Sequence, residues 1–243
     1  SAHILNMKMP FSKDVINEAQ RAAVRENNLD EAYLRPMVFL GSEGMGLRAH
    51  NLKVHVMVAA WEWPAYMSPE ALELGIKVRT SSYTRHHVNI TMCKAKANGN
   101  YINSMLALNE ALSGGADEAL LLDNEGYVAE GSGENVFLIR DKVLYTPELT
   151  SCLDGITRKT IIQLAEEHGY TVREKRLTRD EFYIADEAFF TGTAAEVTPI
   201  RELDGRIIGE GKRGPVTEEL QTVYFDLVRD KHDRHQEWLT HVS

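Results

Sequence analysis

Four short strand patterns follow one another within residues 118–145, and this run constrains the fold more than any other feature. The patterns are apolar or alternating, as strands are, and they cover residues 118–122, 127–130, 135–140 and 143–145. The turn sequences Asn-Glu-Gly at 124–126 and Arg-Asp-Lys at 140–142 join neighbouring strands of the run. Such short connections predict an antiparallel sheet rather than a regular alternation of strands and helices.

Helical patterns lie on both sides of this run, so the sequence predicts an α+β fold. We expect helices at residues 12–27, 100–113, 157–168, 178–184 and 216–227. Further strands are expected at residues 32–40, 53–61, 76–83, 170–177 and 187–191, followed by a hairpin at 197–208. Prolines interrupt the periodicity at residues 62–72. We interpret these residues as a linker between a small domain at 1–61 and a larger domain at 73–243.

Composition excludes several classes of partner. The 243 residues carry a net charge of −9, and this negative field disfavours nucleic acids and anionic membrane surfaces. No apolar run approaches the roughly 20 residues that a membrane-spanning helix needs. The two cysteines lie far apart and outside any metal-binding spacing. We therefore expect a cytoplasmic protein without a metal site and without a membrane or nucleic-acid partner.

Two glycine-containing segments have the character of anion-binding turns. Gly-Ile-Thr-Arg at 155–158 opens the helix expected at 157–168, and Gly-Thr-Ala-Ala-Glu at 192–196 follows a buried strand pattern. The N-terminus of a helix or turn exposes unpaired N–H groups, so a phosphate or carboxylate can bind there. The alternative for the first segment is that Thr157 simply caps the helix.

Two lysines, Lys94 and Lys96, stand just ahead of the helix expected at 100–113. Lys96 has small neighbours on both sides, which suits a lysine that forms a Schiff base. Because an unpaired lysine titrates at about 10.4, it needs partial burial or a cationic neighbour such as Lys94 to become nucleophilic. The alternative is that both are ordinary surface lysines.

The sequence Tyr-Val-Ala-Glu-Gly-Ser-Gly-Glu-Asn at 127–135 places two carboxylates, Glu130 and Glu134, around a serine flanked by glycines. Glycines allow the backbone to approach a ligand closely. A carboxylate held near a ring nitrogen would keep that nitrogen protonated. The alternative is an ordinary turn with both glutamates in solvent.

Together and in this order, these segments resemble the class IV pyridoxal-phosphate aminotransferases, and among them the bacterial branched-chain amino acid aminotransferases. The resemblance extends to Ala-Tyr-Leu-Arg-Pro at 32–36 and Gly-Met-Gly at 44–46, so it covers essentially the whole chain. It implies a two-domain α+β fold of type IV, similar to D-amino acid aminotransferase. The implied reaction moves an amino group from L-leucine, L-isoleucine or L-valine to 2-oxoglutarate, which gives a branched 2-oxo acid and L-glutamate.

The resemblance also implies roles for single residues around pyridoxal 5′-phosphate. Lys96 would form the Schiff base and would later move the proton between substrate and cofactor. Glu130 would pair with the pyridine nitrogen, and Tyr101 would bind the phenolic oxygen of the ring. Ile156, Thr157 and Thr193 would hold the phosphate.

On the substrate side, the resemblance implies that Tyr33, Thr193 and Ala194 bind the α-carboxylate. Arg35 would help admit the side-chain carboxylate of glutamate, and Trp63 would form part of an apolar pocket. The family forms homodimers or trimers of dimers, so we expect a homo-oligomer. Family members begin several dozen residues before Ser1, so we expect the small domain to be incomplete in the printed sequence.

Four other functions stay open at this point. A D-amino acid aminotransferase and an aminodeoxychorismate lyase of the same fold would use the same lysine and glutamate. An inactive module could lack turnover because part of the small domain is missing. A Schiff-base lyase without a cofactor would leave both anion-binding segments without a purpose.

Overall fold

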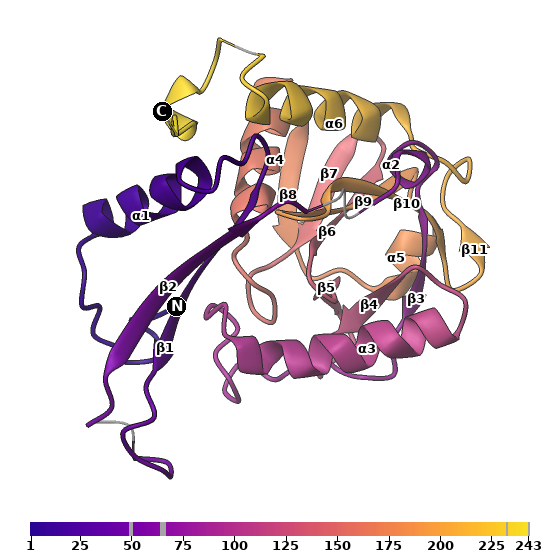
Figure 1. The fold of residues 1–243 in the computed structure, drawn as a ribbon. Helices are drawn as coiled ribbons and strands as arrows, with labels where there is room; N and C mark the ends of the chain where they lie inside the picture. Colours follow the sequence, from indigo (N-terminus) through magenta and orange to yellow (C-terminus); the bar gives the residue numbers. More distant parts are fainter. Residues whose placement is uncertain (49–50, 64–66, 232, 243) are drawn as a thin grey trace. The chain divides into compact units, whose positions relative to one another are not determined.

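The computed structural model describes residues 1–48, 51–63, 67–231 and 233–242. The chain divides into two compact units, one made of Ser1–Ala65 with His235–Ser243 and the other of Tyr66–Arg234. Figure 1 shows the elements of both. None of the described helices is both long and apolar enough to cross a membrane. The domain boundaries expected at 1–61 and 73–243 stay a prediction.

The first unit is a helix on a two-stranded antiparallel sheet. The helix α1 (Lys13–Arg25) begins at the N-cap Ser12, whose side chain accepts a hydrogen bond from the Val15 amide at 3.3 Å. The strands β1 (Tyr33–Leu40) and β2 (Val54–Trp61) pair with Tyr33 opposite Trp61, and α1 packs on β2. A short 3₁₀ helix at Gln236–Trp238 was not expected from the sequence.

The second unit is built on a large mixed sheet with the strand order β5-β4-β3-β10-β9-β6-β7-β8, and β11 pairs with β10. Its strands are β3 (Ile76–Thr80), β4 (Glu118–Leu122), β5 (Val128–Gly131), β6 (Asn135–Arg140), β7 (Val143–Pro147), β8 (Thr171–Lys175), β9 (Glu187–Gly192), β10 (Glu196–Leu203) and β11 (Arg206–Ile207). Its helices are α2 (Pro69–Leu74), α3 (Tyr101–Ser113), α4 (Ile156–Glu167), α5 (Arg179–Tyr183) and α6 (Pro215–Val228), with a 3₁₀ turn at Asn98–Asn100.

The antiparallel pairing expected within residues 118–145 is confirmed, because β4 pairs antiparallel with β5 and β6 pairs antiparallel with β7. Three pairs that include strands outside this run are parallel. β3 runs parallel to β4, β7 parallel to β8, and β10 parallel to β3. The first two pairs enclose α3 and α4 respectively, and a helix supplies the long crossover that a parallel pair requires. The sequence contains both helices, but the hydrophobic pattern does not indicate which strands become neighbours.

Part of the expected linker at 62–72 is helical instead. Ser68 caps α2 by accepting a hydrogen bond from the Ala71 amide at 3.1 Å, and Pro69 occupies the first turn. Proline suits this position because its missing N–H would have no partner there in any case. Residues 64–66 of the expected linker lie outside the described residues.

Two apolar clusters hold the sheet and its helices together. One joins β4, β6 and β10 with α5 through residues such as Leu120, Leu138 and Phe182. The other places α4 and α6 over β9, with Ile161, Leu220 and Phe189 among its buried members. Separately, α3 packs on β4 through alanines and Leu121. These contacts fix the ends of β5, α3 and α4, from which the candidate site is built.

Candidate active site

A hollow of about 310 Å³, open to solvent, lies in the second unit. Its walls come from the loop before α3, the start of α3, the connection between β5 and β6, and the loop before α4. The lining residues are Arg85, Cys93, Ala95, Lys96, Asn100, Tyr101, Glu130, Ser132, Gly133 and Leu153. Three of the residues expected to bind a cofactor, Lys96, Tyr101 and Glu130, therefore line one hollow.

Lys96 lines this hollow and is exposed, so partial burial, one of the two ways expected to make its amine nucleophilic, is absent. Lys96 lies on the loop between β3 and α3, and its Nζ donates a hydrogen bond to Tyr101 Oη at 2.6 Å. The other lysine has a different partner, because Lys94 Nζ donates to the carbonyl oxygen of Cys152 at 2.8 Å. Of the two lysines, Lys96 is the one that lines the hollow.

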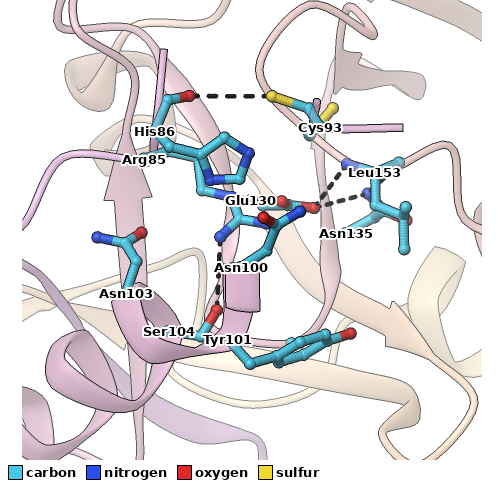
Figure 2. A network of polar contacts seen from close by, with 12 residues as sticks. Arg85, His86, Cys93, Asn100, Tyr101, Asn103, Ser104, Glu130, Asn135 and Leu153 are labelled. Carbon is cyan, nitrogen blue, oxygen red and sulfur yellow. Dashed lines mark hydrogen bonds and ion pairs between the residues drawn. The ribbon is translucent and has the colours of Figure 1, made fainter. Parts of the chain in front are cut away.

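Glu130 is buried and is surrounded by donors (Figure 2). Its Oε1 forms an ion pair with Arg85 Nε at 2.7 Å, and both side chains are more than nine-tenths buried. Its Oε2 accepts hydrogen bonds from the Leu153 amide at 3.0 Å and from Asn135 Nδ2 at 3.4 Å. Burial raises the pKa of Glu130, and the Arg85 guanidinium and the Leu153 amide oppose this rise.

Glu134 is also buried, so the interpretation of 127–135 as a turn with solvated glutamates is wrong at both positions. The amide of Gly133 donates to Glu134 Oε2 at 3.0 Å. Burial and the nearby carboxyl of Glu118 raise the pKa of Glu134 to about 8. This carboxyl therefore keeps its proton at neutral pH, unlike a glutamate in solvent.

The first anion-binding segment begins a helix, although not at the expected residue. α4 starts at Ile156, and Gly155 occupies the N-cap without any side-chain hydrogen bond to the first turn. Thr157 lies inside the helix, so the alternative that it caps α4 is wrong. Ile156 is 83% exposed. The amide groups of this turn therefore have no side-chain cap and suit an anion.

The second segment is a tight turn that joins β9 to the antiparallel β10. Thr193 is exposed in this turn, and Ala194 is partly buried. Among the described residues, no group of three His, Cys, Asp or Glu side chains could hold a metal ion.

The remaining expected residues lie in the first unit and form a cluster of their own. The ring of Tyr33 lies 5.1 Å from that of Trp61 and 4.5 Å from that of Trp63. Arg35 Nη2 donates to Tyr33 Oη at 3.3 Å, and its guanidinium lies 5.1 Å from the centre of the Tyr33 ring. The cluster joins a cation to a broad aromatic surface.

The Glu130 carboxyl contacts three residues for which the sequence predicts no role, namely Arg85, Asn135 and Leu153. Asn135 could have been noticed because it ends the motif that contains both glutamates. Arg85 and Leu153 lie in loops far from Glu130 in the sequence, and no local pattern marks them.

The family model for class IV amino-transferases matches residues 1–203. The chain belongs to the class IV aminotransferases. It is 73% identical to the branched-chain-amino-acid aminotransferase of Pseudomonas aeruginosa, and the alignment covers all of this chain and 79% of that protein. This membership confirms an aminotransferase of the expected α+β fold.

Solved structures of other class IV aminotransferases agree with this result. The branched-chain amino acid aminotransferase of Escherichia coli superposes with a TM-score of 0.97 at 45% identity, over all of this chain and 80% of that one. The T.th. branched-chain amino acid aminotransferase in complex with N-(5′-phosphopyridoxyl)-L-glutamate gives a TM-score of 0.95 at 46% identity, over all of this chain and 79% of that one.

Proposed function

We propose that this class IV aminotransferase moves the amino group of L-leucine, L-isoleucine or L-valine to 2-oxoglutarate with pyridoxal 5′-phosphate as cofactor. The observation that carries the proposal is Lys96 Nζ, 2.6 Å from Tyr101 Oη in the hollow that the buried Glu130 also lines. The name of the Pseudomonas aeruginosa relative supports the branched-chain substrates. The T.th. complex, which holds a phosphopyridoxyl-glutamate compound, supports the cofactor and the glutamate product.

The described residues fit this cofactor at three points. Lys96 offers a primary amine, the uncapped first turn of α4 offers amide donors for a phosphate, and Glu130 offers a carboxyl for a ring nitrogen. We propose that Ile156, Thr157 and Thr193 bind the phosphate group of the cofactor. When bound, the cofactor supplies an electron sink for the negative charge that develops at the substrate Cα.

Lys96 is the proposed catalytic residue. It would hold the cofactor covalently through Nζ, and after release its amine would take the proton from the substrate Cα and deliver it to C4′ of the cofactor. Tyr101 Oη accepts a hydrogen bond from this amine and so orients it. Glu130 would keep a proton on the ring nitrogen, since a neighbouring carboxylate favours the charged pyridinium.

We propose substrate-binding roles for five residues. Tyr33, Thr193 and the Ala194 amide would bind the α-carboxylate, and Arg35 would pair with the side-chain carboxylate of glutamate. Trp63 would contact the branched side chain. The ring cluster of Tyr33, Trp61 and Trp63 supports this assignment because an aromatic surface suits an apolar side chain.

We also propose that the protein works in the cytoplasm as a homo-oligomer, either a dimer or a trimer of dimers. The two described cysteines are free thiols, which suits a reducing compartment. The exposed side of α3 carries Ile102, Met105, Leu106 and Leu112, each at least 44% exposed. An apolar surface of this kind is typical of a contact with another chain, and sedimentation velocity would measure the resulting mass.

The decisive experiment compares Lys96→Ala with Lys94→Ala. Visible absorption of the purified protein, with added pyridoxal phosphate and then with L-leucine, reports the covalent link and its reaction. We expect Lys94→Ala to keep the absorption band, and Lys96→Ala to lose both the band and transamination from L-leucine. A band that survives in Lys96→Ala and disappears in Lys94→Ala would assign the Schiff base to Lys94.

The same preparation distinguishes the related activities of this fold. We expect turnover with L-leucine and little with D-alanine or aminodeoxychorismate. A preference for either of the latter would replace the branched-chain assignment and leave the cofactor site intact.

A further inference from the structure

Asn135 contacts groups at two ends of the proposed cofactor site. It is the first residue of β6, it is buried, and its side-chain Nδ2 donates to the carbonyl oxygen of Leu153 at 2.8 Å. The same Nδ2 lies 3.4 Å from Glu130 Oε2 (Figure 2). One buried amide therefore contacts the proposed ring-nitrogen partner and the loop that leads into α4.

Leu153 completes a small closed network. Its amide donates to Glu130 Oε2 at 3.0 Å, while its carbonyl accepts from Asn135. The backbone of Leu153 is thus held on one side by the Glu130 carboxyl and on the other by the Asn135 amide. Moving any one of these three groups requires the other two to move.

The other atom of the Asn135 amide faces the start of α4. A Cβ added to Gly155, the N-cap of this helix, would lie 2.1 Å from Asn135 Oδ1. Only a residue without a Cβ allows the backbone to lie this close to the Asn135 side chain. The Gly155 backbone, which leads into the uncapped first turn of α4, therefore rests directly on Asn135.

We propose that Asn135 is a positioning residue that holds the Glu130 carboxyl and the first turn of α4 at a set separation. The inference rests on the proposed function, in which these two groups bind the ring nitrogen and the phosphate of one rigid cofactor. A rigid ligand gains affinity from two contacts at once only when both binding groups are already in place. Asn135 supplies this pre-organisation without touching the cofactor.

The test measures how much affinity the phosphate group adds. The dissociation constants of pyridoxal phosphate and of pyridoxal, which lacks the phosphate, are measured with the cofactor-free wild-type protein, Asn135→Ala and Gly155→Ala. The dissociation constant of pyridoxal divided by that of pyridoxal phosphate reports the affinity that the phosphate adds. We expect this ratio to fall roughly tenfold in Asn135→Ala. We expect Gly155→Ala to show the same fall, because its methyl group displaces the Asn135 side chain.

Asn103→Ala is the matched control. Asn103 also donates one side-chain hydrogen bond to a backbone carbonyl, that of Thr84 at 3.2 Å, and it is not among the residues that line the hollow. We expect this variant to keep the wild-type ratio. Thermal unfolding of each variant checks the fold, and Gly155→Ala provides the result if Asn135→Ala does not fold.

The possible outcomes distinguish a failure of the role proposed for Asn135 from a failure of the proposed function. If Asn135→Ala weakens both ligands equally, the side chain stabilises the loop without setting the separation, and the inference is overturned. A wild-type ratio in Asn135→Ala overturns it as well. If the wild-type protein binds neither ligand, the proposed function itself fails.

Discussion

Glu130 and Glu134 stand at the two ends of one tight connection, yet the main charge next to each of them has the opposite sign. The connection is closed by the Gly131 amide, which donates to the Glu134 carbonyl at 2.7 Å, and both side chains are buried. Glu130 faces the guanidinium of Arg85, whereas Glu134 faces the carboxyl of Glu118. Burial raises the pKa of both carboxyls, and the comparison shows that the neighbouring charge opposes this rise at Glu130 and adds to it at Glu134.

This difference suits two separate tasks. A carboxyl compensated by a buried cation can stay anionic inside the protein and present negative charge to a ring nitrogen. A carboxyl beside a second carboxyl keeps its proton and behaves as a neutral hydrogen-bonding group. We therefore expect Glu130 to act in turnover and Glu134 to act in the structure of the β5–β6 connection.

The largest expected effect is the loss of stability on replacing Arg85 by methionine. This change leaves Glu130 buried without its cation, and breaking a buried pair in this way costs about 3–5 kcal/mol of unfolding free energy. Urea unfolding measures the loss. The double variant Arg85→Met with Glu130→Gln should recover much of it, and a double variant as unstable as the single one would show that the charge of Glu130 is not the cause.

A smaller effect is expected on turnover when the two glutamates are compared directly. Glu130→Gln removes the carboxyl that is proposed to pair with the ring nitrogen, so we expect kcat with L-leucine to fall by about 10²–10³-fold, the size typical of a lost electrostatic contact. Glu134→Gln replaces a carboxyl that already carries its proton, and we expect kcat to change less than about threefold. Equal losses in the two variants would remove the distinction between the two glutamates.

The last expected effect is a change in the stability of the protein with pH, which Glu134→Gln removes, and per pH unit it is the smallest of the three. The pKa of Glu134 rises from an ordinary 4.5 to about 8 on folding, so between these values the folded state holds a proton that the unfolded state has lost. Stability of the wild-type protein therefore falls as pH rises through this window, by at most about 1.4 kcal/mol per pH unit, and levels off above pH 8. Glutamine does not titrate.

Urea unfolding of wild type and Glu134→Gln from pH 5 to pH 9 measures this difference. The advantage of the glutamine variant should grow steadily up to pH 8 and then stay constant. A difference that does not change with pH would show that Glu134 is already ionised in the folded protein at pH 5.

The residue pattern along the chain is sufficient to predict most of the local structure and one part of the site. The helix at 13–25 follows from its Ser12 cap and its periodicity, and the strands at 118–122 and 135–140 have the expected bounds. Lys96 and Tyr101 are close in the chain, and a single turn brings the amine to the hydroxyl. Such features depend on neighbours along the chain, and the residue pattern reports those neighbours directly.

Three features depend on contacts between distant parts of the chain: which strands run parallel, which carboxyl pairs with a cation, and which groups hold Glu130 in place. Arg85, Leu153 and Asn135 reach Glu130 from two loops and from the start of a strand. The alternative of an ordinary turn with solvated glutamates could be excluded only from the structure, since the burial of both side chains depends on elements such as β4 and the loop before α4. The burial of a side chain and the charges around it depend on groups that the fold brings together from distant parts of the chain. The residue pattern of one segment therefore does not predict them.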